Sequence, residues 1–131
     1  MDAIPRHARP LRAALIGGLV LAAAALLVAR SGWAHAFPDR SEPRVGATLS
    51  ASPSEVRIWF DGELEPVFSL IRVENGEKQR VDRGDGRVSP QNSRLLEISV
   101  PPLPPGKYRV FWSVIARYGH RTEGDFPFRI K

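Results

Sequence analysis

The chain has 131 residues, no cysteine, one methionine at its start and a formal net charge of +5. Its length suits one domain once a leader is removed, and the lack of cysteine excludes a disulfide framework and a thiolate metal site. The charge is uneven, because residues 1–34 carry +3 and residues 35–131 only +2. Basic and acidic residues alternate along the second part, so we expect a solvated surface and no nucleic-acid partner.

Residues 1–34 have the composition of an export signal. A polar, basic start precedes residues 13–29, an uncharged run of Ala, Leu, Ile, Val and Gly, and the small residues Gly32 and Ala34 follow. This order is typical of a secretory signal peptide. We predict a helical signal peptide over residues 1–34 that is cleaved after Ala34, and an exported domain over residues 35–131. The alternative is an uncleaved membrane anchor, because about 17 apolar residues is the lower limit for a spanning helix.

Residues 35–131 alternate apolar and polar side chains with the period of a β-strand. A polar lead-in with prolines occupies residues 35–43, and residues 101–106 (PPLPPG) exclude a central strand or a helix, because proline lacks the N–H donor. No helical period follows residue 34. Short strands separated by turn signals predict an antiparallel β-sandwich or a Greek-key barrel. The expected strands cover 47–49, 55–60, 69–74, 78–82, 94–100, 107–117 and 123–131.

His35 and His120 are the only histidines beyond residue 34. Cleavage after Ala34 makes His35 the first residue, and a free N-terminal amine titrates near ~7.7, so a metal ion displaces its proton readily at neutral pH. Imidazole and amine nitrogens suit Cu(II). We predict that the two histidines meet at one end of the β-fold and supply three nitrogens to Cu(II). The alternative is that each histidine is an ordinary surface residue that binds no metal, as a lone histidine in a connection between β-strands usually is.

The fourth ligand is left open by the residues themselves. Water, a carboxylate from the loop 61–65 and the phenol of Tyr118 are the candidates, with Glu63 and Glu65 more simply read as solvated loop acids. A phenol with a pKa of about 10 is a poor ligand at neutral pH, although a bound dication lowers that pKa. Tyr118 is equally well explained as an aromatic lid or a neutral loop residue.

Several pieces of the chain, in this order and spacing, resemble the periplasmic copper-resistance proteins of the CopC type. The resemblance covers essentially all of residues 35–131. The matching pieces are His35-Ala36, Ser41-Glu42-Pro43, Gly46-Ala47-Thr48-Leu49, residues 55–60 (EVRIWF), 64–69 (LEPVFS) and 103–110 (LPPGKYRV), and Gly119-His120 with residues 123–126 (EGDF).

The resemblance implies a cupredoxin- or immunoglobulin-like β-fold of about seven strands that carries copper and performs no catalysis. In that family Cu(II) is bound by the amine and ring of an N-terminal histidine, by a second histidine near the C-terminus, and by an Asp two residues before it. His35 and His120 match the two histidines, but Tyr118 stands at the Asp position. Some members also carry a methionine-rich Cu(I) site, which this chain lacks because Met1 is its only methionine.

We therefore predict a periplasmic carrier or buffer that holds Cu(II) for copper homeostasis or resistance. Its expected partners are the copper ion and an inner-membrane copper transporter or another periplasmic copper protein, with the membrane contacted only through an uncleaved leader. A metal-free β-sandwich that binds another protein is the alternative that the loss of the Asp favours. A copper-dependent oxidative enzyme shares only the pairing of a terminal histidine with a second one, which is a weak analogy.

Overall fold

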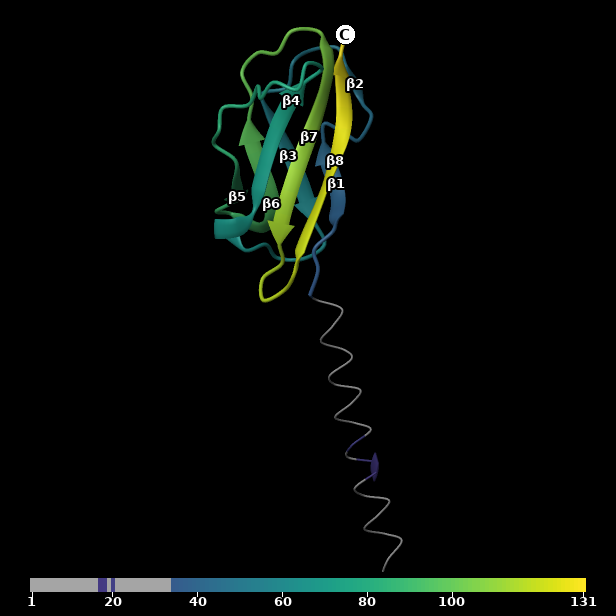
Figure 1. The fold of residues 1–131 in the computed structure, drawn as a ribbon, viewed down its shortest axis with the longest axis vertical. Helices are drawn as coiled ribbons and strands as arrows, with labels where there is room; N and C mark the ends of the chain where they lie inside the picture. Colours follow the sequence, from purple (N-terminus) through teal and green to yellow (C-terminus); the bar gives the residue numbers. More distant parts are fainter. Residues whose placement is uncertain (1–16, 19, 21–33) are drawn as a thin grey trace, which may run out of the picture. The chain divides into compact units, whose positions relative to one another are not determined.

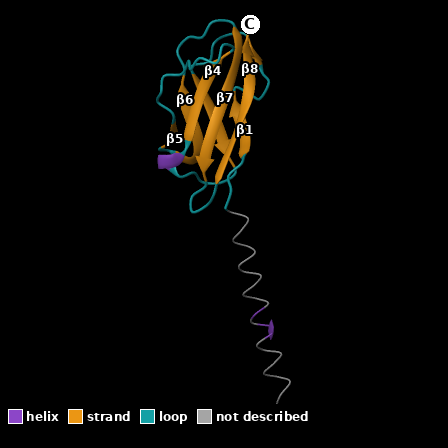
Figure 2. Cartoon of the chain, viewed as in Figure 1, coloured by secondary structure: helices purple, strands orange, loops and turns teal. Residues whose placement is uncertain are grey.

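The chain folds into a sandwich of two four-stranded β-sheets, as the computed structural model shows (Figures 1 and 2). The structure describes residues 17–18, 20 and 34–131, so the predicted signal peptide lies almost wholly outside the described residues. No helix among the described residues is long and apolar enough to cross a membrane. In spatial order the first sheet contains β1 (Pro38–Glu42), β3 (Glu55–Phe60), β6 (Asn92–Ser99) and β5 (Arg87–Ser89), and the second contains β2 (Thr48–Leu49), β8 (Arg121–Ile130), β7 (Gly106–Ile115) and β4 (Leu70–Asn75).

The all-β prediction is confirmed, and of its two alternatives the structure has the sandwich. Residues 34–131 form eight strands, and the two sheets remain separate and do not close into a barrel. The strands that the sequence did not predict are β1, which we expected to be an irregular lead-in, and the short β5. The strand expected at 78–82 is absent, because the Asp82 carboxylate accepts the Val73 N–H at 2.8 Å and only the single bridge between Glu74 and Arg80 forms.

The core lies between the sheets and follows the alternation in the sequence. Every second residue of β3 is buried, and the same holds for the second half of β8, as expected when one face of each strand covers the core. On β7, Tyr108, Val110 and Val114 are buried. The indole of Trp112 crosses the neighbouring strand at Gly124, where an added Cβ would lie only 2.7 Å from the ring. The absence of a side chain there lets Trp112 reach the ring of Phe60, with centroids 5.3 Å apart.

A short segment before β1 is fixed to the same end of the sandwich as the hairpin between β7 and β8. Ala36 is fully buried in the core, and its carbonyl accepts a hydrogen bond from the Thr122 hydroxyl at 2.6 Å. The next residue, Phe37, exchanges hydrogen bonds with Asp61, whose carboxylate accepts the Phe37 N–H at 2.8 Å. The segment 34–37 is therefore held from both sides, by the loop that follows β3 and by the start of β8.

The hairpin between β7 and β8 is a tight turn over Ala116–His120. The last paired residues are Ile115 and Arg121, and the Gly119 N–H donates to the Ala116 carbonyl at 2.8 Å. Tyr118 occupies the third position of this turn with a φ of +61°, a left-handed conformation that glycine or asparagine normally supplies. The turn also binds the β3–β4 loop, because the Arg117 N–H donates to the Glu63 carbonyl at 2.9 Å.

The hydroxyl of Thr122 is expected to stabilise the attachment of the segment 34–37. Replacing Thr122 by Val keeps the β-branched shape but leaves the buried Ala36 carbonyl without its donor, which costs about 1–3 kcal/mol. Urea unfolding of a chain that starts at His35 measures this loss. Thr48→Val is the matched control, because Thr48 is exposed on β2. Equal stability of the two variants would contradict the role given to Thr122.

Candidate metal site

The fold brings His35 and His120 together at one end of the sandwich. Their ring centroids are 5.3 Å apart and their planes differ by 28°. His35 comes from the segment 34–37 and His120 from the β7–β8 hairpin, and both side chains are exposed. The pairing of the two imidazoles, which the sequence predicts, is thus a feature of the described structure.

Contacts of the residues on either side of His35 set the distance between the two histidines. The His120 N–H donates to the Ala34 carbonyl at 2.7 Å, and Ala36, two residues after Ala34, is anchored in the core. His35 stands between these two fixed points. Sequence reasoning did not identify Ala36 and Thr122 as the residues that anchor the segment 34–37. The sequence offered only the small side chain of Ala36 and the position of Thr122 near the start of a strand as signals of this role.

The separation of the rings fits two ligands of one ion. Rings bound through nitrogen at about 2.0–2.1 Å from an ion have centroids roughly 4 to 6 Å apart, and the observed 5.3 Å lies in that range. Because both side chains are exposed, rotation about their χ angles can turn the ring nitrogens toward one point without disturbing the core.

Two carboxylates of the β3–β4 loop, those of Asp61 and Glu63, lie at the same end of the sandwich but already have partners. Gly62 lies against the His35 carbonyl, with 3.7 Å between that oxygen and an added Cβ. The Asp61 carboxylate accepts the Phe37 N–H, and the Glu63 carboxylate pairs with the Arg117 guanidinium at 3.0 Å. Within residues 34–131 no group of three or more His, Cys, Asp or Glu side chains is placed to hold a metal ion. Among the residues that the structure describes, no third side chain of these types is therefore already in place beside the two rings.

Tyr118 does not cover the histidines. Its side chain is 100% exposed at the tip of the hairpin, so it is not packed as a lid over either ring. Its left-handed φ of +61° is costly for a residue with a large side chain.

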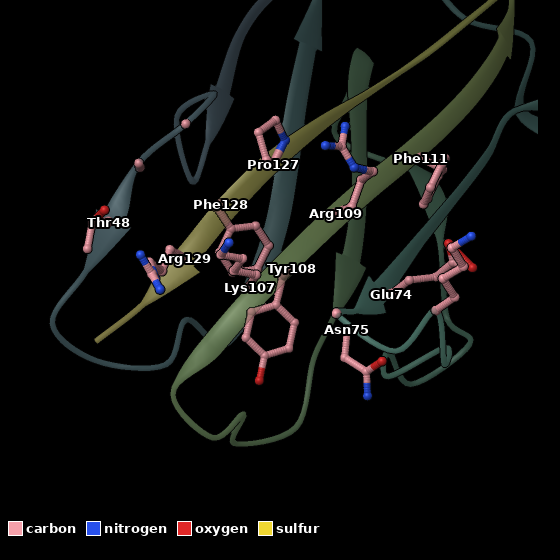
Figure 3. A pocket seen from close by; sticks show the side chains of 14 residues that line it. Thr48, Glu74, Asn75, Lys107, Tyr108, Arg109, Phe111, Pro127, Phe128 and Arg129 are labelled. Atoms are coloured by element: carbon pink, nitrogen blue, oxygen red, sulfur yellow. The ribbon is translucent and has the colours of Figure 1, made fainter.

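A hollow lies beside β7 and β8, along residues 107–111 and 127–129, away from the hairpin that carries His120 (Figure 3). Its volume is about 660 Å³, and Lys78, Lys107, Arg109 and Arg129 line it together with Glu74. It contains no histidine, and lysine and arginine cations are not ligands for Cu(II). The paired imidazoles and this hollow are therefore separate features of the domain.

Comparison with known proteins places this chain in a family. The CopC domain matches residues 39–131. The copper resistance protein C of Escherichia coli is 28% identical over 127 residues, which cover 92% of this chain and 96% of that protein. The protein YobA of Escherichia coli is 30% identical over 106 residues, covering 80% of this chain and 86% of YobA.

A longer relative and a solved structure agree with this assignment. The copper transport protein CutJ of Bacillus subtilis is 29% identical over 102 residues, but these cover only 19% of CutJ, so the chain spans about a fifth of that relative. The crystal structure of CopC from Methylosinus trichosporium superposes with a TM-score of 0.69 at 29% identity, covering 74% of this chain and 94% of that one.

The family match, over residues 39–131, runs from β1 through the hairpin that carries His120 to the end of β8. On that basis the chain belongs to the CopC family.

Proposed function

We propose that this chain, processed after Ala34, is a periplasmic protein that binds Cu(II) and acts as a carrier or buffer in copper homeostasis or resistance. The observation that carries the proposal is the 5.3 Å separation of the rings of His35 and His120. The names of two relatives, a copper transport protein and a copper resistance protein, support the same chemistry.

Removal of the leader supplies the third nitrogen. In the unprocessed chain the nitrogen of His35 is an amide, whose delocalised lone pair makes it a poor metal ligand unless its proton is first removed. After cleavage it becomes an amine, and a free N-terminal amine has a pKa of about 7.7. A metal ion therefore displaces its proton at small cost. The hydrogen bond from His120 to the Ala34 carbonyl, 2.7 Å long, shows that this nitrogen lies beside the Gly119-His120 backbone. The amine and both rings are thus available in one place.

The exposure of the site fits a protein that delivers copper. Both imidazoles reach solvent at the end of the sandwich, so a partner's ligands can approach an ion held between them without opening the core. An inner-membrane copper transporter or another periplasmic copper protein fits this role. A metal-free module that binds another protein is the second candidate, and the lack of a third metal-binding side chain within residues 34–131 is the observation that favours it.

Cu(II) titration of defined chain lengths tests the proposal. The chain that starts at His35 is expected to bind one equivalent of Cu(II), because it offers an amine and two rings. Adding Ala34 converts the amine into an amide and is expected to weaken binding at least tenfold, or about 1.4 kcal/mol. His120→Ala is expected to weaken it similarly, with thermal unfolding as the control for the fold. Equal affinity for both lengths would exclude the amine as a ligand.

Restoring the family's carboxylate at position 118 is expected to strengthen binding. Tyr118→Asp introduces an anionic oxygen ligand, and Asp tolerates the left-handed φ of +61° better than Tyr. Tyr118→Asn is the matched control, because it relieves the same backbone strain without adding charge. We expect roughly tenfold tighter Cu(II) binding for Asp, equivalent to about 1.4 kcal/mol, and no such gain for Asn. A similar gain in both variants would assign the effect to the backbone.

A further inference from the structure

A narrow slot beside the two histidines is filled by the carbonyl group of Ala34. One wall is the His120 N–H, which donates to the Ala34 oxygen at 2.7 Å. The other wall is Gly119, where an added Cβ would lie 2.2 Å from that oxygen and 2.8 Å from the carbonyl carbon. Gly119 is therefore required here for close approach, and any side chain would displace the carbonyl.

Cleavage after Ala34 removes the carbonyl and leaves the slot. The His120 N–H then loses its acceptor, and Gly119 has no side chain that could fill the space. The carbonyl carbon of Ala34 is bonded to the nitrogen of His35, so the empty slot opens directly beside the new amine. A backbone N–H without a partner is unfavourable unless water or another acceptor binds it.

We propose that this slot receives the oxygen ligand that completes the coordination of Cu(II), an inference that rests on the function proposed above. Three nitrogens leave one position of a tetragonal Cu(II) site to be filled. The family's Asp is absent, Tyr118 is fully exposed, and Asp61 and Glu63 are engaged elsewhere. The remaining local group that can orient a ligand is the His120 N–H, and hydrogen bonds of this kind hold metal ligands in place.

The size of the slot selects a small oxygen donor. A Cβ added at Gly119 would also lie 3.1 Å from the Ala116 side chain, so this side chain limits the space on that side of Gly119. Water fits this space, as does one oxygen of a carboxylate that arrives from outside. Both accept a hydrogen bond from the N–H and donate a lone pair to the metal.

The effect of Gly119→Ala on the metal-free protein tests the slot without copper. In a chain that retains Ala34, the new methyl group collides with the backbone carbonyl, so we expect a lower unfolding temperature. In a chain that starts at His35 that obstacle is gone, and we expect a much smaller change. Gly76→Ala is the matched control, because its Cβ would meet only the Lys107 carbonyl at 3.7 Å. If Gly119→Ala lowered the unfolding temperature equally in the chain that retains Ala34 and in the chain that starts at His35, the proposed slot would be contradicted.

Electron paramagnetic resonance of the copper-loaded chain that starts at His35 identifies the ligand. Line broadening in ¹⁷O-enriched water is expected if water occupies the slot, and a spectral change on adding formate is expected if a carboxylate does. Gly119→Ala should abolish either response and weaken Cu(II) binding roughly tenfold, as loss of a partner of a metal ligand does.

The outcomes separate this inference from the proposed function. Absence of Cu(II) binding by the wild-type chain would overturn both. Normal binding with neither response, or with the same affinity and spectrum in Gly119→Ala, would overturn the slot alone and leave the function in place.

Discussion

The burial of Ala36 is the contact on which the candidate site depends. Chain termini usually fray unless something holds them, and a frayed His35 would gain nothing from the presence of His120. Here a methyl side chain enters the core two residues after Ala34, and Thr122 binds the carbonyl of the same residue at 2.6 Å. The entropy of ordering the first residues is thus offset by core packing, before any metal binds.

The same contact explains why loops from both sheets meet at this end. The segment 34–37 leads into β1 of one sheet, while Thr122 belongs to β8 of the other. The bridge between Leu64 and Ala116 and the ion pair between Glu63 and Arg117 add further links across the gap. An exposed ion pair contributes little to stability, but these links restrict the loops that carry the two imidazoles.

The sequence predicted those parts of the molecule in which one local signal dominates. Apolar and polar side chains alternate clearly where a strand covers the core with one face, so the sequence predicted β3, β7 and β8. It is absent from β1, a largely exposed edge strand with no apolar residue besides Pro38, and β1 was missed. The meeting of His35 and His120 was predicted because they are the only histidines beyond residue 34, and the resemblance to the CopC family reinforced that prediction. The slot at Gly119 was not, because a close approach between distant backbone segments leaves no periodic trace in the sequence.

Tyr118 stands where the resemblance to the CopC family implies an aspartate ligand in the proposed site. Its left-handed φ of +61° is one that Asp adopts more easily than Tyr, so backbone geometry does not account for the tyrosine. Loss of the carboxylate removes one negative charge beside the ion. Cu(II) held by neutral nitrogens and a small oxygen donor keeps more of its positive charge than Cu(II) bound to a carboxylate. Such an ion is released more easily to a partner that offers an anionic ligand, which suits a carrier better than a permanent store.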